Sequence, residues 1–189
     1  PMSARRQRQM CIRDSNIVDN NTFSSSELNI SKPTLIMFIC NHCPYVIHYH
    51  DEIKKLALDY LDRFNFVAIS SNDIENYPQD SPEKMKELWH KLGLDFPYLY
   101  DESQEIAKLY KAECTPEFYL FNSSNKLVYR GRLDESSPGS ESKPSGKDLR
   151  NAMENLLNNN RISEEQYPSM GCNIKSVSYT HLRAHETTD

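Results

Sequence analysis

The sequence predicts an α/β fold, because strand-like and helix-like segments alternate along its 189 residues. The clearest strand is an unbroken apolar run at residues 35–39, of the kind that forms a buried strand. Helical apolar spacing follows it directly, and a second apolar run stands at residues 66–70. With 38% hydrophobic residues the chain can bury one sizeable core, so we expect a single domain.

The segment after the first strand is expected to be a helix from about residue 43 to residue 61. Its apolar side chains recur every three or four residues, which places them on one face of a helix. This stripe consists of Val46, His50, Ile53, Ala57 and Tyr60. Because His50 shares the stripe with core residues, we expect a core histidine whose hydrogen bonds are satisfied.

Capping residues mark two further helices. Ser81 can cap the first, Pro82 suits its first turn, and Gly93 ends it. After a short extended piece at residues 96–100, Asp101 and Gln104 form a predicted capping pair for the next helix.

The last third of the chain predicts a hairpin and a final helix. Residues 117–121 and 126–130 flank the turn sequence Asn-Ser-Ser-Asn, as the two strands of a hairpin do. A polar stretch at residues 135–146 then precedes a helix whose apolar residues are Leu149, Met153, Leu156 and Leu157.

Both ends of the chain differ from the part between them. Residues 1–13 contain four arginines without an acid or an apolar period, and residues 176–189 show no pattern. Both resemble translated adapter sequence on chains assembled from environmental DNA, so we expect a domain at residues 14–175 between two non-native ends. The alternative is a natural arginine-rich head and a disordered tail. A truncated N-terminus would also lack any signal peptide, so the compartment stays open, with the cytoplasm favoured.

Charge and cysteine content narrow the function classes. The net charge of −5 argues against a nucleic-acid binder that neutralises phosphates, and no apolar run is long enough to span a membrane. Five cysteines do not form the pattern of a secreted disulfide framework. They favour redox or metal chemistry in a reduced thiol pool.

The sequence Cys40-Asn41-His42-Cys43 lies where the first strand meets the first helix. A strand that leads directly into C-x-x-C at a helix start is a redox arrangement. Two sulfurs three positions apart can close a disulfide, and the helix N-terminus stabilises the attacking thiolate. His42 would favour a thiolate at Cys40, unless it is a solvent-facing histidine with little effect.

Four segments in this order resemble a peroxiredoxin-like branch of the thioredoxin superfamily. They are FICNHCPYV at 38–46, FPYLYD at 96–101, CTPEF at 114–118 and GCNIK at 171–175. The resemblance implies a thioredoxin-like fold, with a central mixed β-sheet flanked by helices. It also implies that Thr115-Pro116 faces the C-x-x-C with a cis peptide bond and presents backbone groups to a substrate.

The same resemblance sorts the remaining site residues. Asn41, His42, Thr115 and Pro116 would modulate the thiols or face the substrate. Cys114 would lie near the active site and Cys172 near the end of the domain, and both are candidate secondary thiols. Each has the alternative of being a packing residue, since free cysteines are commonly buried.

Three departures separate this chain from better-known relatives. Ile39 stands where thioredoxin has a tryptophan, and the strand before it lacks thioredoxin's buried acid. Peroxiredoxin chemistry expects a threonine three residues before the peroxidatic cysteine. The residue at that position is Met37 for Cys40 and Cys40 for Cys43, so the threonine is absent.

The sequence therefore predicts a thiol–disulfide oxidoreductase that serves redox homeostasis. Cys40 would be the exposed nucleophile and Cys43 the buried resolving thiol, with no cofactor beyond their disulfide. The partners would be a protein or small-molecule disulfide or thiol and a thiol electron donor. One alternative is a peroxiredoxin-like thiol peroxidase that forms a sulfenic acid at Cys40 or Cys43. The other is a non-catalytic binding or redox-sensor domain whose cysteines are structural or hold metal, although no second ligand pair for zinc is present.

Overall fold

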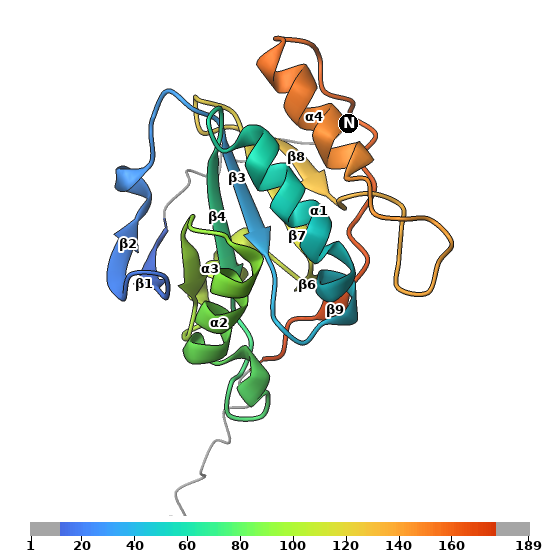
Figure 1. Cartoon of the computed structure of the whole chain (residues 1–189). Coiled ribbons are helices and arrows are strands. Elements are labelled where there is room, and N and C mark those ends of the chain that lie inside the picture. The colour runs from blue at the N-terminus through green and yellow to red at the C-terminus, as the bar shows by residue number, and fades with distance from the viewer. Residues whose placement is uncertain (1–11, 177–189) are drawn as a thin grey trace, which may run out of the picture.

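The computed structural model describes residues 12–176, which form one mixed β-sheet covered by helices on both faces (Figure 1). The seven strands of this sheet follow the order β2-β1-β5-β4-β3-β7-β8. Their bounds are β1 Arg13–Asn16, β2 Asn21–Ser24, β3 Thr34–Phe38, β4 Asn65–Ser70, β5 Tyr98–Tyr100, β7 Glu117–Phe121 and β8 Leu127–Gly131. The predicted α/β class and thioredoxin-like architecture are confirmed.

Parallel and antiparallel pairs divide this sheet. Strands β3, β4 and β5 run parallel, whereas β7 pairs antiparallel with β3 and β8 pairs antiparallel with β7. A separate two-stranded sheet pairs β6 (Cys114–Thr115) with β9 (Cys172–Asn173). This small sheet joins the predicted Thr-Pro segment to the end of the domain, and it contains both candidate secondary thiols, Cys114 and Cys172.

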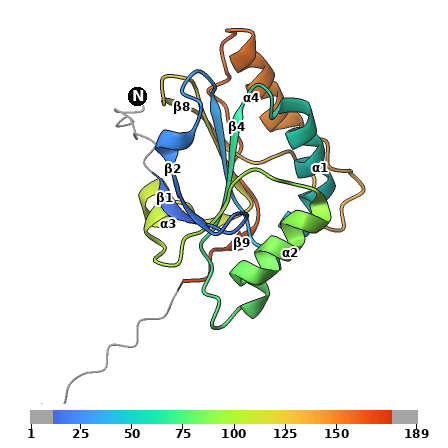
Figure 2. The ribbon, with the colours of Figure 1, turned by 60° about the vertical axis from the view of Figure 1, so that its left-hand side comes forward.

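Four α-helices cover the two faces of the large sheet unequally (Figure 2). Helices α1 (Pro44–Tyr60), α2 (Pro82–Leu92) and α4 (Lys147–Leu157) lie on one face, and α3 (Glu105–Tyr110) lies on the other. Side chains of β3 alternate accordingly, because successive strand residues point to opposite faces. Leu35 and Met37 join the larger apolar cluster under α1, whereas Ile36 and Phe38 join the cluster under α3.

The capping predictions are confirmed for α2 and corrected for α3. Ser81 accepts a hydrogen bond from the backbone N–H of Lys84, and Gly93 ends α2 in the left-handed conformation at φ +68°. The Asp101 carboxylate accepts the backbone N–H groups of Ile106 and Ala107 at 3.2 and 2.9 Å. Gln104 is the N-cap residue of α3, but its side chain makes no capping hydrogen bond, and its amide donates to the carbonyls of Ser71 and Lys175.

The sheet extends to the N-terminal edge of the described residues. Ile12 is 1% exposed within the cluster under α3, and Arg13 pairs with Ser24 in β1 and β2. The predicted domain border after residue 13 thus falls inside the first strand. The rest of both predicted non-native ends, at residues 1–11 and 177–189, lies outside the described residues. No helix within residues 12–176 is long and apolar enough to cross a membrane.

Candidate active site

The C-x-x-C segment forms the loop between β3 and α1, as its sequence position predicts. Cys43 is the N-cap residue of α1, and Pro44 occupies the first turn of that helix. All four cysteines of the described part of the chain are free thiols. The expectation that Cys40 is exposed is wrong, because Cys40 and Cys43 are only 1% and 0% exposed.

Thr115 explains this burial, because it lies against both sulfurs. Its hydroxyl oxygen is 3.3 Å from Cys40 Sγ, and its carbonyl oxygen is 3.1 Å from Cys43 Sγ. The peptide bond between Thr115 and Pro116 is cis, as the family resemblance implies. Thr115 follows Cys43 by 72 residues in the sequence, and the fold places it beside both thiols.

A third thiol reaches the same place from the end of the domain. Cys172 is the strand partner of Thr115 in the small sheet, and its sulfur is 3.0 Å from Cys43 Sγ. Cys172 is half-buried, so it is more accessible than either sulfur of the C-x-x-C. Sequence reasoning named Cys172 without choosing between a thiol role and packing, because no local spacing connects it to Cys43.

Cys40 and Cys43 have opposite pKa shifts. The pKa of Cys43 is lowered to about 4, first by the hydrogen bond from the Cys40 thiol. A bond from Cys172 and the first-turn amide of Val46 add to this shift. The pKa of Cys40 is raised, first by its hydrogen bond to Cys43, then by burial and by the charge of Asp80. These opposite shifts favour a negative charge on Cys43, at the helix N-terminus, over one on Cys40.

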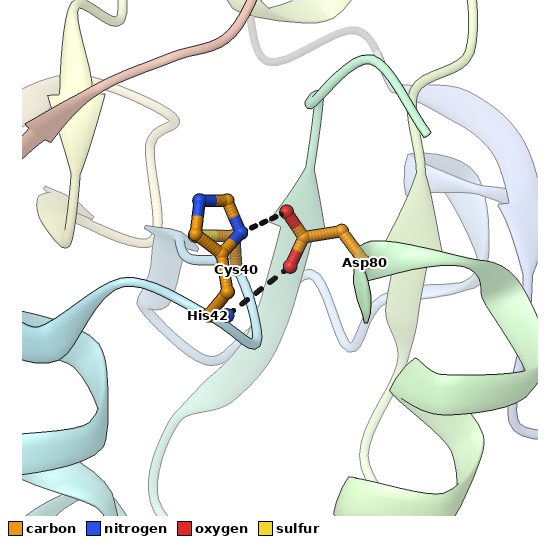
Figure 3. Close-up of side chains that lie close together, drawn as sticks. All are labelled: Cys40, His42 and Asp80. Atoms are coloured by element: carbon orange, nitrogen blue, oxygen red, sulfur yellow. Dashed lines mark hydrogen bonds and ion pairs between the residues drawn. The ribbon is translucent and has the colours of Figure 1, made fainter. Parts of the chain in front are cut away.

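Asp80 is the functional residue that the sequence analysis missed. It ends the 3-10 helix η2 (Pro78–Asp80) and is completely buried beside the C-x-x-C loop (Figure 3). One carboxylate oxygen accepts the backbone N–H groups of Asn41 and His42 at 2.7 and 3.2 Å. The other accepts the Asn72 amide at 2.8 Å and lies 2.6 Å from His42 Nδ1. A buried acid is thus present at the site, although it does not come from the strand before the cysteines.

His42 points toward this carboxylate and stacks on Tyr77, with ring centroids 5.1 Å apart. Its side chain is 19% exposed, so it is not the solvent-facing histidine of the alternative interpretation. The expectation that the loop favours a thiolate at Cys40 is wrong, because the pKa of Cys40 is raised, first by its hydrogen bond to Cys43. Asn41 is anchored similarly, since its side-chain amide donates to the Gln79 carbonyl at 3.1 Å.

Three groups of this loop have the chemistry of metal ligands. Cys40 Sγ and ligand atoms of His42 and Asp80 lie within 4.8 Å of one another. The Asp80 oxygens, however, already accept four hydrogen bonds between them. A metal ion would have to replace some of these bonds, so the donor set fits a metal poorly, and a metal-free site stays a prediction.

The remaining candidate residues lie around this centre. Cys114 is half-buried, with its sulfur 3.9 Å from the carbonyls of Pro116 and Ser169. Burial, followed by the charge of Glu117, raises its pKa to about 12. The expectation for His50 is wrong, because its buried Nε2 has no hydrogen-bond partner among the described residues. Burial accordingly lowers the pKa of His50.

Comparison with known families bears on this geometry. Residues 12–147 match the sequence profile of the family described as Redoxin. The chain belongs to the Redoxin family. The matched part of this Redoxin chain includes the C-x-x-C loop, Asp80 and Thr115-Pro116, but it ends before Cys172. Comparison with curated protein sequences gave no significant match.

Two solved structures share this fold at high identity. An uncharacterized conserved protein from Geobacillus kaustophilus is 46% identical, with a TM-score of 0.86 over 89% of this chain and 90% of that chain. A hypothetical protein from Sinorhizobium meliloti 1021 is 36% identical, with a TM-score of 0.86 over 90% and 93% of the two chains. A secreted Mycobacterium tuberculosis disulfide oxidoreductase, at 17% identity and a TM-score of 0.56 over 78% and 96%, shares the fold alone.

Proposed function

We propose that this Redoxin chain is a thiol–disulfide oxidoreductase whose redox couple is Cys40 and Cys43. Family membership supports a thioredoxin-like redox function. The observation that carries the finer proposal is the pair of free thiols at the start of α1, with Thr115 against both sulfurs. Because the pKa of Cys43 is lowered to about 4, first by the hydrogen bond from Cys40, Cys43 can take the proton of Cys40 as Cys40 attacks a disulfide.

The reaction is a pair of thiol–disulfide exchanges. As Cys40 attacks one sulfur of the substrate disulfide, its proton moves to Cys43 and the other substrate half leaves as a thiolate. Cys43 then gives this proton to the departed thiolate and attacks Cys40 in the mixed disulfide. The substrate has gained two electrons and is released as two thiol groups, one of them ionised, and Cys40–Cys43 is oxidised. A thiol electron donor returns the couple to the reduced state.

Cys40 and Cys43 are buried to the same extent, at 1% and 0% exposed, so we assign the attack to Cys40 from the neighbours of each sulfur. Cys43 contacts Cys172 and the Thr115 carbonyl, and its sulfur also meets the first-turn amide of α1. Cys40 precedes Asn41 and His42, which are both partly exposed. Since Cys40 itself is buried, residues around it must move when a substrate binds. The substrate would be a protein or small-molecule disulfide or thiol.

Single-cysteine variants test this assignment. Cys43→Ser is expected to trap a mixed disulfide with a model disulfide substrate through Cys40, and Cys40→Ser is expected to abolish reduction. Cys114→Ser is the matched control and should retain reduction, because the hydrogen bonds of its sulfur are to the backbone carbonyls of Pro116 and Ser169. Turnover of the disulfide that persists in Cys40→Ser would contradict the proposal.

A thiol peroxidase is the second candidate function. The threonine that peroxidatic chemistry expects is absent from the local sequence, but the Thr115 hydroxyl lies 3.3 Å from Cys40 Sγ. Hydrogen peroxide would oxidise the cysteine to a sulfenic acid and be reduced to water, and a second thiol would resolve the product. We expect turnover of a model disulfide to exceed that of hydrogen peroxide. Faster peroxide consumption, lost in Thr115→Val, would favour the peroxidase instead.

A further inference from the structure

The segment that ends the described chain is fastened across the active site. Strand β9 pairs with β6, beside the first turn of α1 (Figure 1). Beyond β9, the backbone N–H of Lys175 donates to the Asn72 side chain at 2.8 Å, and its carbonyl accepts from Asp73 and Gln104. Before β9, the Ser169 hydroxyl donates to the Gly131 carbonyl at 2.7 Å.

Gly171 lets this segment approach the Thr-Pro loop closely. A Cβ atom at residue 171 would lie only 2.1 Å from the Thr115 carbonyl oxygen, which is far inside van der Waals contact. The backbone therefore passes directly over Thr115, and the next side chain, Cys172, reaches Cys43. This close approach fixes the third thiol at the pair.

The sulfurs of Cys43 and Cys172 lie near bonding distance. Their separation is 3.0 Å, whereas a disulfide has an S–S distance of about 2.05 Å. A thiol held so close to another sulfur acts at a high effective concentration, because little further ordering is needed for reaction. A packing role alone would not require the sulfur to face Cys43.

Cys172 is more accessible to a partner in solution than Cys40 or Cys43. Both cysteines of the C-x-x-C are buried, whereas Cys172 is half-buried, with the exposed Asn173 next to it and the 54% exposed Met170 two residues before it. A reducing partner can reach Cys172 more readily than the inner couple. Electrons delivered to Cys172 can then pass to Cys43 by exchange.

We propose that Cys172 is a third redox-active thiol. It exchanges with the Cys40–Cys43 disulfide and so moves the disulfide from the buried pair to a more accessible position. The Cys172 sulfur attacks Cys43, the bond between Cys40 and Cys43 breaks, and the Cys172 proton ends on Cys40. The products are a Cys43–Cys172 disulfide and a free Cys40 thiol, so no external oxidant is needed. A thiol donor then reduces the outer disulfide. This step rests on the proposed function, because it consumes the disulfide that the function forms.

The Cys40→Ser protein isolates the new pair. After oxidation with glutathione disulfide and alkylation, trypsin separates Cys43, Cys114 and Cys172 into peptides 14–54, 112–126 and 162–175. We expect most of Cys43 to be cross-linked between peptides 14–54 and 162–175. The cross-link should persist in Cys40→Ser/Cys114→Ser, and Cys40→Ser/Cys172→Ser should yield only the glutathione adduct of Cys43. A glutathione adduct at Cys43 beside an alkylated Cys172 in Cys40→Ser would overturn the proposal.

The wild-type protein separates this inference from the function on which it rests. A closed Cys40–Cys43 disulfide, seen within peptide 14–54, supports the oxidoreductase whether or not Cys172 reacts. We also expect a second population with Cys43 linked to Cys172 and Cys40 alkylated. Burial raises the pKa of Cys172 to about 11, so this population should form faster as pH rises. A closed inner disulfide without any outer disulfide at high pH would overturn the exchange and leave the oxidoreductase standing.

Discussion

His42 Nδ1 lies 2.6 Å from a carboxylate oxygen of Asp80, although 38 residues separate them in the chain. The same carboxylate also accepts the backbone N–H groups of Asn41 and His42, so it holds the loop between the two cysteines. Because Asp80 is completely buried, its charge acts on Cys40 with little screening by water. The acid thus shapes the loop and also opposes ionisation of the first cysteine.

Asp80→Asn is expected to let Cys40 ionise at lower pH. The pKa of Cys40 is raised first by Cys43, then by burial and by the Asp80 charge, and the substitution removes only the last of these. The measurement is the pH dependence of Cys40 alkylation in a Cys43→Ser background, with and without Asp80→Asn. Glu83→Gln, which changes an acid in the first turn of α2, should leave the profile unchanged.

The same variant should also lower stability. An asparagine side chain would offer one oxygen acceptor where the Asp80 carboxylate accepts four hydrogen bonds, so we expect a loss of about 1–3 kcal/mol in unfolding free energy. Urea unfolding under reducing conditions measures this loss. In the alkylation experiment, a Cys40 profile that stays fixed or moves to higher pH in Asp80→Asn would contradict the effect assigned to the Asp80 charge.

Removal of Ile12 and Arg13 is expected to destabilise the sheet. Ile12 is 1% exposed, and burial of an isoleucine side chain contributes about 1.5–3 kcal/mol. Arg13 adds the first pairing of β1 with β2. The test compares urea unfolding of a chain that begins at residue 12 with one that begins at residue 14. Equal midpoints would show that the domain border predicted after residue 13 is correct.

The sequence predicted those parts of the fold that local patterns encode. The apolar run before Cys40 became β3, and helical spacing together with Ser81 and Gly93 marked α1 and α2 within one or two residues. The position of Cys43 at a helix start also followed from this local order. Each of these features depends on residues that are close together in the chain.

The parts of the site that the sequence did not predict depend on distant contacts. Asp80 meets His42 across 38 residues, and Cys172 meets Cys43 across 129. No spacing or composition near Asp80 distinguishes it from other acids. The burial of Cys40 was missed for the same reason, because it results from Thr115, which is 75 residues away.

The reduced protein is expected to contain little zinc. Cys40, His42 and Asp80 are close enough to share an ion, but the hydrogen bonds already made by Asp80 compete with it. Protein purified under reducing conditions without added metal should contain well under one equivalent by elemental analysis. Stoichiometric zinc that survives chelation would favour a structural metal site and would contradict the redox assignment.

Cys43 should make the stability of the reduced protein depend on pH. Its folded pKa is lowered to about 4, first by the hydrogen bond from Cys40, whereas an unfolded thiol ionises near about 8.5. Between these values the folded state holds fewer protons, so this contribution grows with pH and is lost as pH falls through 4. The difference in unfolding free energy between wild type and Cys43→Ala should therefore be larger at pH 7 than at pH 5.

Cys114→Ala provides the control for this measurement. Burial raises the pKa of Cys114 to about 12, so this thiol keeps its proton in both folded and unfolded states at pH 5 and pH 7. Its difference from wild type should not change between these two pH values. A Cys43→Ala difference that is equally flat would show that the negative charge does not lie on Cys43.

Gly171→Ala is expected to move Cys172 away from the active site. The added Cβ would lie 2.1 Å from the Thr115 carbonyl oxygen, which is backbone and cannot turn aside as a side chain can. Crowding of this kind costs about 1–3 kcal/mol, and it should loosen β9 from β6. We expect a lower urea midpoint and faster alkylation of Cys172.

Gly139→Ala is the control, because open space surrounds residue 139 and only its φ of +80° opposes a side chain. We expect that control to lose stability only through backbone strain and to leave Cys172 alkylation unchanged. Unchanged Cys172 alkylation in Gly171→Ala would show that the close passage over Thr115 does not hold the third thiol in place.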